Sequence, residues 1–465
     1  MKKSTALLYL FFLLITELSS AQVPVLIGMT SSGGKYGNGT IIKVNGDGSG
    51  FDTLYSFDEY PGYQPWGSLM KDTSSLVYGM TQLGGAQDRG AIFSFNPSTN
   101  AYIDIYDFVG TDGELPQGNL IQASDGNLYG VASAGGANSF GVIFKFTPTT
   151  NTYTDLHDFD NSDGQAPTGS LIQNGNNLYG VTSAGGNTTY GVIFSYNISN
   201  NTYSKLYVFD GSQGEIPYGN LIMANNGTLY GLASGGGTKL SGVIFSFNPS
   251  GNVYGDVYNF EGAGNGFAPH GSLALGDDGN LYGMTELGGN NSDGILFRFN
   301  PDSSTFKKLY DFNGINGSVP HGSLFNGTNR ILYGMTSSGG TDSLGNIFSF
   351  NPTNGVLTNL VSFNDTLGAY PYGDLLEIGT VTGIDQISAC SNNVFIYPNP
   401  SNGTLTISSE KNIDEIRVTN LLGQLTYTAQ PKLTNYKINL NEDGLYFVTI
   451  TSGDEIITRD VVISK

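Results

Sequence analysis

The sequence predicts an all-β protein: a seven-bladed β-propeller followed by a small β-sandwich. A Leu-Tyr-Gly motif, a glycine-rich run and a Gly-x-Ile-Phe-x-Phe-Asn motif recur about every 51 residues through most of the chain. Aromatic and β-branched residues lie between turn clusters, whereas helix formers are scarce. The tyrosine of the motif recurs at Tyr78, Tyr129, Tyr179, Tyr230, Tyr282 and Tyr333, with Ile27 in its place at the first copy.

Each repeat is predicted to supply four strands. In the third copy, residues 128–133 and 141–146 read as strands joined by a glycine-rich loop, and a hairpin leads to a third strand at 153–159. A longer loop then reaches 167–172, which we assign to the inner strand of the next blade. In the strand at 102–108, a period of two places Tyr102, Tyr106 and Phe108 on one face and Ile103 and Ile105 on the other.

The two ends of the repeat region are expected to close the propeller together. Each blade begins at a Pro-x-Gly-x-Leu segment, but the chain enters the first repeat without one, and the seventh segment has no repeat after it. We therefore predict that residues 373–378 pair with residues 26–31, which leaves no exposed inner edge. The segments start at Pro65, Pro116, Pro167, Pro217, Pro269, Pro320 and Pro371.

Composition and the N-terminus predict export. Residues 1–21 resemble a secretory signal peptide, with Lys2 and Lys3, an apolar run and small residues at 19–21. No later stretch reaches 18 apolar residues, so a membrane-spanning product is not expected. Cys390 is the only cysteine, which excludes an intramolecular disulfide. The formal charge of -20 disfavours nucleic acid as a partner.

Beyond the repeats, residues 379–392 are predicted to be a linker and residues 393–465 a separate domain, whose alternating strands and turns favour a small Ig-like β-sandwich. The segment has turn and strand residues at Tyr397, Pro398, Asn399, Pro400, Gly403, Gly423, Gly444 and Tyr446. In these residues it resembles the type A C-terminal sorting domain of the type IX secretion system of Bacteroidota. The resemblance implies passage across the outer membrane, release or attachment at the cell surface, and the secretion machinery as a partner.

The repeats also resemble a named tandem repeat, the GloVer type (Gloeo_Verruco). The resemblance is carried by a Gly-x-x-x-x-Gly-x-x-Phe core such as residues 136–144, with Tyr-Gly before it and Phe-Asn-Pro after it in most copies. It covers about 350 residues. The family is defined by its repeat, so the resemblance implies an architecture and no activity.

Strand direction predicts where a site would lie. The glycine-rich loop and the long crossing loop of each blade return to the same end, which we call the top face, and loops carry function more often than scaffolds do. At this end, the residue between Pro and Gly is not fixed by repeat packing. Aromatic or imidazole side chains there could stack on sugar rings, or could simply cover the blade ends. These candidate ligand-binding residues are Trp66, Tyr218, His270, His321 and Tyr372.

No cofactor and no metal is predicted. His270 and His321 could share an ion, but the sequence shows no third ligand, and His157 occupies a strand position that tyrosine fills elsewhere. The acidic loops at 45–48 and 160–164 lack the glutamate of a calcium loop and read as turns. No nucleophile elbow, zinc helix or phosphate loop is present. Four crossing-loop acids could in principle serve a glycosidase: Glu59, Glu114, Glu215 and Glu261.

The sequence thus favours a secreted or cell-surface binding protein whose top face engages polysaccharide or another macromolecule. Two alternatives remain open: a secreted polysaccharide hydrolase or lyase, and a structural or adhesion protein of the cell envelope. No catalytic residue is assigned.

Overall fold

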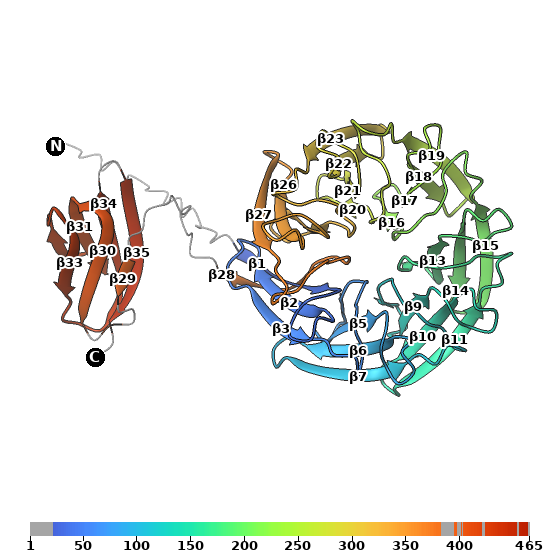
Figure 1. Cartoon of the computed structure of the whole chain (residues 1–465), viewed down its shortest axis with the longest axis horizontal. Helices are drawn as coiled ribbons and strands as arrows, with labels where there is room; N and C mark the ends of the chain where they lie inside the picture. The colour runs from blue at the N-terminus through green and yellow to red at the C-terminus, as the bar shows by residue number, and fades with distance from the viewer. Residues whose placement is uncertain are drawn as a thin grey trace, which may run out of the picture. The chain divides into compact units, whose positions relative to one another are not determined.

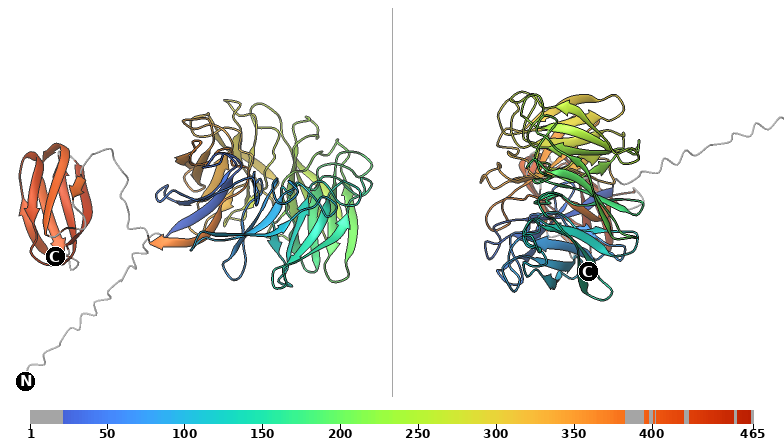
Figure 2. Two further views of the ribbon diagram at one scale, coloured as in Figure 1. Left: turned by 60° about the horizontal axis from the view of Figure 1, so that its bottom comes forward. Right: turned by 90° about the vertical axis from the view of Figure 1, so that its right-hand side faces the viewer.

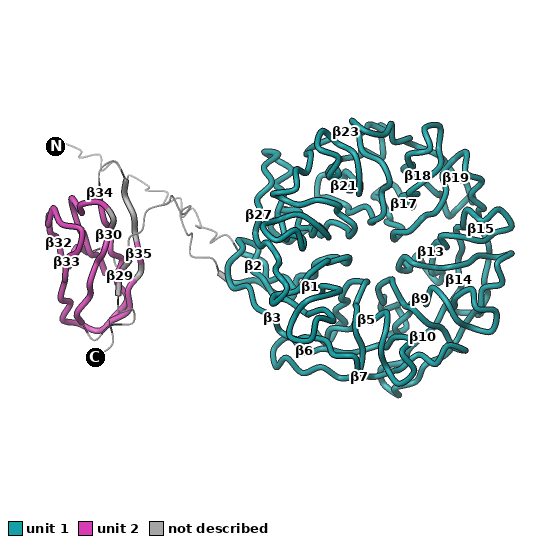
Figure 3. The backbone as a smooth tube through the Cα atoms, viewed as in Figure 1, with its two compact units in different colours: residues 1–383 teal, residues 384–465 magenta. Residues whose placement is uncertain are grey.

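The computed structural model describes residues 22–382, 395–397, 401, 403–420, 424–452 and 455–463. These residues form strands, turns and bends without a helix, and so include no apolar helix of membrane-spanning length. The chain divides into two compact units, residues 1–383 and 384–465 (Figure 3). The expected signal peptide and residues 383–392 of the expected linker lie outside the described residues.

Seven antiparallel four-stranded sheets make up the described part of the first unit, and they lie around a common centre (Figure 1). Sheet 1 has the order β28 (Leu376–Thr382), β1 (Gln22–Thr30), β2 (Thr40–Asn45), β3 (Asp52–Ser56). Sheet 2 contains β4 (Met70–Lys71), β5 (Val77–Thr81), β6 (Ala91–Asn96) and β7 (Ala101–Asp107), and sheet 3 contains β8 (Ile121–Gln122), β9 (Leu128–Ala132), β10 (Val142–Thr147) and β11 (Thr152–Asp158).

The next four sheets repeat this pattern, with each sheet's last strand at the periphery (Figure 1). Sheet 4 contains β12 (Ile172–Asn174), β13 (Asn177–Thr182), β14 (Val192–Asn197) and β15 (Thr202–Val208), and sheet 5 contains β16 (Ile222–Met223), β17 (Leu229–Ala233), β18 (Val243–Asn248) and β19 (Val253–Asn259). Sheet 6 contains β20 (Ala274–Leu275), β21 (Leu281–Thr285), β22 (Ile295–Asn300) and β23 (Thr305–Asp311), and sheet 7 contains β24 (Phe325–Asn326), β25 (Leu332–Thr336), β26 (Asn346–Asn351) and β27 (Val356–Ser362).

Sheet 1 joins the two ends of the repeat region. β28 pairs antiparallel with β1 (Figure 2), and Ile27 faces Leu376 across the pair. The expected pairing of the two ends is therefore present in part: residues 376–378 belong to it, whereas residues 373–375 and 28–31 do not. The strand also continues beyond the expected boundary at residue 378, because Gly379 to Thr382 pair with Val25 to Gln22.

Neighbouring sheets are held together by buried apolar clusters that each draw on two sheets. Ile27 and Ile41 of sheet 1 pack with Phe93 of sheet 2, and the series continues to sheets 7 and 1, where Met335 packs with Leu26. Burying one such large side chain contributes about 2 kcal/mol. Packing between sheets, repeated around the unit, is therefore the main source of its stability.

A β-bulge in the outer pair of strands corrects the predicted alternation. Between β6 and β7 the register shifts, so that Tyr106 pairs with Ile92 but Asp104 pairs with Phe93. Beyond the bulge the side chains change face: Tyr102 stacks on Tyr55 of sheet 1, whereas Tyr106 stacks on Tyr153 of sheet 3. The prediction that Tyr102 and Tyr106 share a face was wrong, because an extra residue in one strand reverses the alternation.

Ring stacking across the outer strands explains His157. Its ring lies 4.0 Å from that of Tyr203 in the next sheet with 4° between the planes, the same arrangement as Tyr106 on Tyr153 at 4.2 Å and 3°. Its Nε2 is 2.9 Å from Asp163 Oδ2. His157 is therefore the packing substitute for tyrosine that its strand position predicts.

The second unit contains two sheets that share one buried core. The first has the order β29 (Phe395–Tyr397), β30 (Thr404–Ile413), β33 (Leu433–Asn439), and the second the order β32 (Leu425–Ala429), β31 (Glu415–Asn420), β34 (Gly444–Ser452), β35 (Glu455–Ile463). Leu405 and Ile438 of the first sheet lie in the same cluster as Ile416, Val448 and Val461 of the second. Two sheets that enclose one core in this way make a β-sandwich.

Candidate functional site

A pocket lies where the Pro-x-Gly-x-Leu segments of all seven repeats meet. Its lining consists of residues 66–68, 117–119, 168–169, 218–220, 270–272, 321–323 and 372–374. The cavity has a volume of about 90 Å³, well below the roughly 300–1,000 Å³ of a pocket that encloses a drug-sized ligand. It can therefore enclose a small group, while a larger ligand would rest on its rim.

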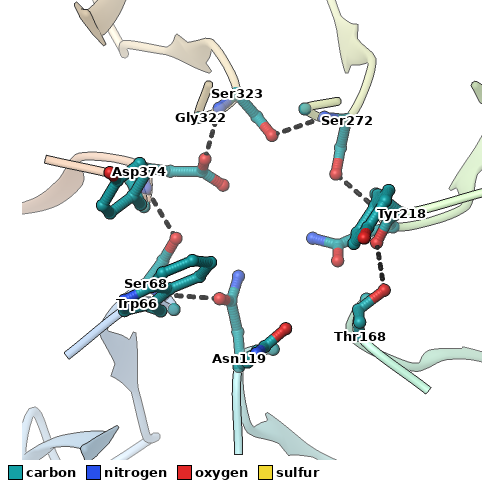
Figure 4. A pocket seen from close by; sticks show the side chains of 18 of the residues that line it. Trp66, Ser68, Asn119, Thr168, Tyr218, Ser272, Gly322, Ser323 and Asp374 are labelled. Carbon is teal, nitrogen blue, oxygen red and sulfur yellow. Dashed lines mark hydrogen bonds between the residues drawn. The ribbon is translucent and has the colours of Figure 1, made fainter. Parts of the chain in front are cut away.

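A ring of hydrogen bonds surrounds the pocket (Figure 4). Each member donates its backbone N–H to a side-chain oxygen of the next, at 2.5–2.7 Å, and the last member donates back to the first. Every member directly follows the glycine of its segment and has an oxygen-bearing side chain, a signal that the sequence prediction missed by leaving this position as x. The members are Ser68, Asn119, Ser170, Asn220, Ser272, Ser323 and Asp374.

The glycine of each segment is required by close approach between neighbouring segments. A Cβ on Gly219 would collide with the carbonyl oxygen of Gly271, and one on Gly271 would collide with the carbonyl oxygen of Gly322. The same relation links all seven glycines, and Gly373 meets Gly67. Space, rather than an unusual backbone conformation, therefore demands glycine here.

The five candidate ligand-binding residues are brought together at this pocket, and all five are half-buried. Trp66 stacks on Tyr372 with ring centroids 4.6 Å apart, and Tyr372 meets His321 edge-on at 5.0 Å. His321 stacks on His270 at 4.9 Å, and His270 lies 5.1 Å from Tyr218. The rings thus form one continuous arc, in which part of each aromatic surface is already used by its neighbour.

A carboxylate that the sequence prediction missed joins the two histidines. Nδ1 of His270 lies in close contact with Oε2 of Glu286, and the two groups form an ion pair when the imidazole is protonated. The contact with His270 lowers the pKa of Glu286. Burial, aided by His270, lowers the pKa of the His321 imidazole to about 4. His321 is therefore neutral at pH 7.

The loops meet as strand direction predicts. Each crossing loop bridges to the glycine-rich loop of the following repeat, as in the pairs Glu114 with Ala134 and Glu215 with Gly235. The crossing-loop acids do not line the pocket, where Asp374 is the only carboxylate. A glycosidase needs two carboxyl groups about 5–9.5 Å apart. The pocket lining does not supply such a pair.

The acidic loops hold their own turns together. Asp47 Oδ1 accepts hydrogen bonds from the backbone N–H and the hydroxyl of Ser49. Asp160 Oδ1 does the same for Ser162, and this hydroxyl is the main cause of the lowered pKa of Asp160. The aspartates of both loops therefore stabilise their own turns through hydrogen bonds, as the spacing of these residues predicts.

Asp374 should make stability depend on pH. Burial raises its pKa in the folded state above the ordinary value of 3.8, so the stability that its protonated form contributes is present at acidic pH and is lost as the pH rises through the raised pKa. Asp374→Asn keeps the oxygen that accepts from the Ser323 N–H and removes the charge. We expect it to raise the urea midpoint at about pH 8 and to raise it less at about pH 5.

The companion variant Asp374→Ala removes the acceptor altogether. It should lower the midpoint at both pH values, because the Ser323 N–H is left without its partner. An equal gain from Asp374→Asn at the two pH values would show that charge burial is not the cause.

Only some of the sorting-motif residues can be placed. Gly403 and Gly444 have positive φ angles of 112° and 155°, and Tyr446 donates its hydroxyl to the Glu442 carbonyl at 3.0 Å. Tyr397 ends β29. The other motif residues, Pro398, Asn399, Pro400 and Gly423, lie outside the described residues.

Comparisons with known proteins agree with this architecture. The Gloeobacter/Verrucomicrobia repeat profile matches residues 18–188, 121–274 and 172–397, and the secretion system C-terminal sorting domain profile matches residues 395–464. No curated protein matches the sequence.

One solved structure shows a likeness of fold, and a second is similar at a lower TM-score. The periplasmic gluconolactonase PpgL of Pseudomonas aeruginosa is 16% identical with a TM-score of 0.54, over 76% of this chain and 98% of that one. PorZ of Porphyromonas gingivalis, a surface component of the type IX secretion system, is 13% identical with a TM-score of 0.47, over 91% of this chain. The chain spans 63% of the length of PorZ.

The sorting domain directs the protein to secretion and cell-surface attachment, and so involves it with the type IX secretion machinery. The repeat profile covers most of the chain. The chain belongs to the Gloeobacter/Verrucomicrobia repeat family and carries a type IX C-terminal sorting domain.

Proposed function

We propose that this exported protein is a cell-surface binding protein, and that its seven sheets close into a seven-bladed β-propeller whose central pocket engages the end or a side group of a polysaccharide. The single observation that carries the proposal is the convergence of five ring-bearing side chains, from five separate sheets' entry segments, at one pocket. The repeats do not require rings there, since Gln117 and Thr168 occupy the same position.

Closure is supported by three kinds of contact that join the end of the repeat region to its beginning. β28 pairs with β1, the apolar clusters run from sheet 7 to sheet 1, and Asp374 donates to Ser68 in the hydrogen-bonded ring. A closed ring fixes the seven entry segments around one axis, so that the side chains at the pocket are held by backbone on every side. A rigid rim of this kind lowers the entropic cost of binding.

The chemistry of the rim favours a sugar. Faces of Trp66, Tyr218 and Tyr372 can stack on the apolar face of a pyranose, and side-chain amides such as those of Gln117 and Asn119 can bond its hydroxyls. The net charge of -20 favours a neutral polysaccharide over a polyanionic one. The small cavity has room for a substituent of one sugar unit at the axis, with the chain resting across the rim.

A glycan array tests the proposal. The variant that combines Trp66→Gln, Tyr218→Thr and Tyr372→Gln takes its replacements from the chain's own repeats, so the scaffold should be preserved. If each ring contributes about 1 kcal/mol of stacking, affinity for the glycans that bind the wild-type protein should fall on the order of 100-fold.

Tyr36→Gln is the matched control, since Tyr36 is 46% exposed and is not among the pocket residues. It should leave affinity unchanged. Retained binding in the triple variant, or an array on which the wild-type protein binds nothing, would count against the proposal.

A further inference from the structure

A cluster of two histidines and one glutamate is the strongest unassigned feature of this molecule. His270, His321 and Glu286 each present one ligand atom, and these atoms lie within 4.8 Å of one another. All three side chains are half-buried, and the two imidazoles belong to the pocket lining. Among the described residues, they form the only group of at least three His, Cys, Asp or Glu side chains that is close enough to hold an ion.

The three residues break the repeat at two separate positions. Histidine occurs between Pro and Gly only in two neighbouring segments, at His270 and His321. Glu286 stands where five repeats have serine, and those hydroxyls donate to a carbonyl of the preceding crossing loop, as Ser133 does to Leu115 at 2.7 Å. The serines in question are Ser31, Ser133, Ser183, Ser234 and Ser337.

Glu286 keeps the backbone hydrogen bond to the crossing loop but lacks the side-chain hydrogen bond that the serines make. Its N–H donates to the Ala268 carbonyl at 3.1 Å, as the serine N–H groups do in other repeats. Its side chain cannot donate to that carbonyl when ionised and turns instead to His270. The glutamate that replaces this serine lies together with the only two histidines found between Pro and Gly, which points to a role of the three as a set.

We propose that His270, His321 and Glu286 bind one divalent transition-metal ion, with zinc the best fit, at the rim of the central pocket. Two imidazoles and one carboxylate are the donor set of open zinc sites, in which three protein ligands leave a fourth position for water or a bound ligand. Nδ1 of His270 already lies against Oε2 of Glu286, so an ion bound by these two side chains would replace a contact that exists within the cluster. The rings of His270 and His321 are stacked with 18° between their planes, so their edges can face the same ion.

The site needs modest side-chain rotation to accept zinc. Ligand atoms about 2.0–2.2 Å from a tetrahedral ion are roughly 3.3 Å apart, so the contact between His270 and Glu286 must open, while separations of up to 4.8 Å must close. The adjoining cavity of about 90 Å³ has space for the remaining water ligands. Metal binding does not depend on the proposed polysaccharide function, because it can be measured on the protein alone.

The test uses the chain from residue 22 to residue 465, freed of metal with a chelator and kept in excess Mg²⁺ to occupy surface carboxylates. Calorimetric titration with ZnCl₂ should give one saturable site per chain. Titration with CoCl₂ should give visible d–d bands and should quench Trp66, the only tryptophan, whose ring lies 6.4 Å from that of His321.

Each variant replaces a ligand residue by the residue that another repeat has at the equivalent position. Glu286→Ser restores the common serine, His321→Gln copies Gln117, and His270→Thr copies Thr168. Each should weaken zinc binding at least about tenfold. His157→Tyr, the third histidine replaced by the tyrosine usual at its position, should bind zinc as the wild type does.

Three results would each overturn the proposal: no saturable zinc site in the wild-type protein, Co²⁺ binding that leaves Trp66 fluorescence unchanged, or wild-type affinity in Glu286→Ser and His321→Gln. Trp66 quenching locates the ion on the wild-type chain, so this part of the test does not rely on the folding of any variant. Since no glycan is present, a negative glycan array leaves the expected metal result unchanged.

Discussion

A chain that ends at residue 370 is expected to melt roughly 10 °C below one that ends at residue 382. The missing segment holds the closing strand β28, the buried side chain of Leu375, and Asp374, which joins the hydrogen-bonded ring on both sides. Loss of two or three buried apolar side chains costs about 2 kcal/mol each, and an inner edge of β1 is left unpaired. Differential scanning calorimetry of the two chains measures the difference.

The chain that ends at residue 382 is the matched reference, because it lacks the second unit but keeps every strand of the first. Its main transition should coincide with that of the first unit in the full chain. Equal melting temperatures for the two truncated chains would show that β28 does not hold the first unit together, and the proposed closure would then be wrong.

Gly219→Ala is the second change with a large expected effect. The added Cβ would collide with backbone atoms of Gly271 and with Oγ of Ser272, the side chain that accepts the Asn220 N–H at 2.6 Å. Neither neighbour is the free end of a flexible side chain, so the entry segments must move apart. We expect the free energy of unfolding to fall by about 3 kcal/mol or more, measured by urea titration.

Gly264→Ala provides the control for the change from glycine to alanine itself. A Cβ on Gly264 meets nothing within 4 Å, and no positive φ requires glycine there. Its effect should stay within about 0.5 kcal/mol. If both substitutions cost the same, close approach of the segments is not what demands glycine at the pocket.

Repeat spacing was sufficient to predict the strands of each sheet and the fact that the two ends pair, but not which residues the pair includes. Both follow from counting: seven entry segments and a first repeat without one leave a single strand for Ile27 and its neighbours to pair with. Counting could not reveal the outer bulge. The bulge in β7 changes neither the length of the repeat nor its composition, so the sequence pattern gives no sign of it. It nevertheless turns Tyr102 and Tyr106 toward opposite neighbouring sheets.

Position within the repeat was also sufficient to predict part of the candidate site. Position within the repeat predicted that Trp66, Tyr218, His270, His321 and Tyr372 would share one end, and the structure brings them to one pocket. Glu286 was missed because it lies in a different part of the repeat, and only the three-dimensional arrangement places it beside His270. Comparison of equivalent positions across repeats could have identified it, since it is the only charged residue at a position that is serine in five repeats and glutamine, Gln82, in the other.

The order of the last two segments affects which chains leave the cell. β28 ends at Thr382, and the match to the sorting domain begins at residue 395, so synthesis finishes the last strand of the first unit before it begins the sorting domain. A product that stops short of β28 carries no sorting domain and is not expected to cross the outer membrane. Export therefore selects, without any separate inspection step, for molecules that possess every strand of the first unit.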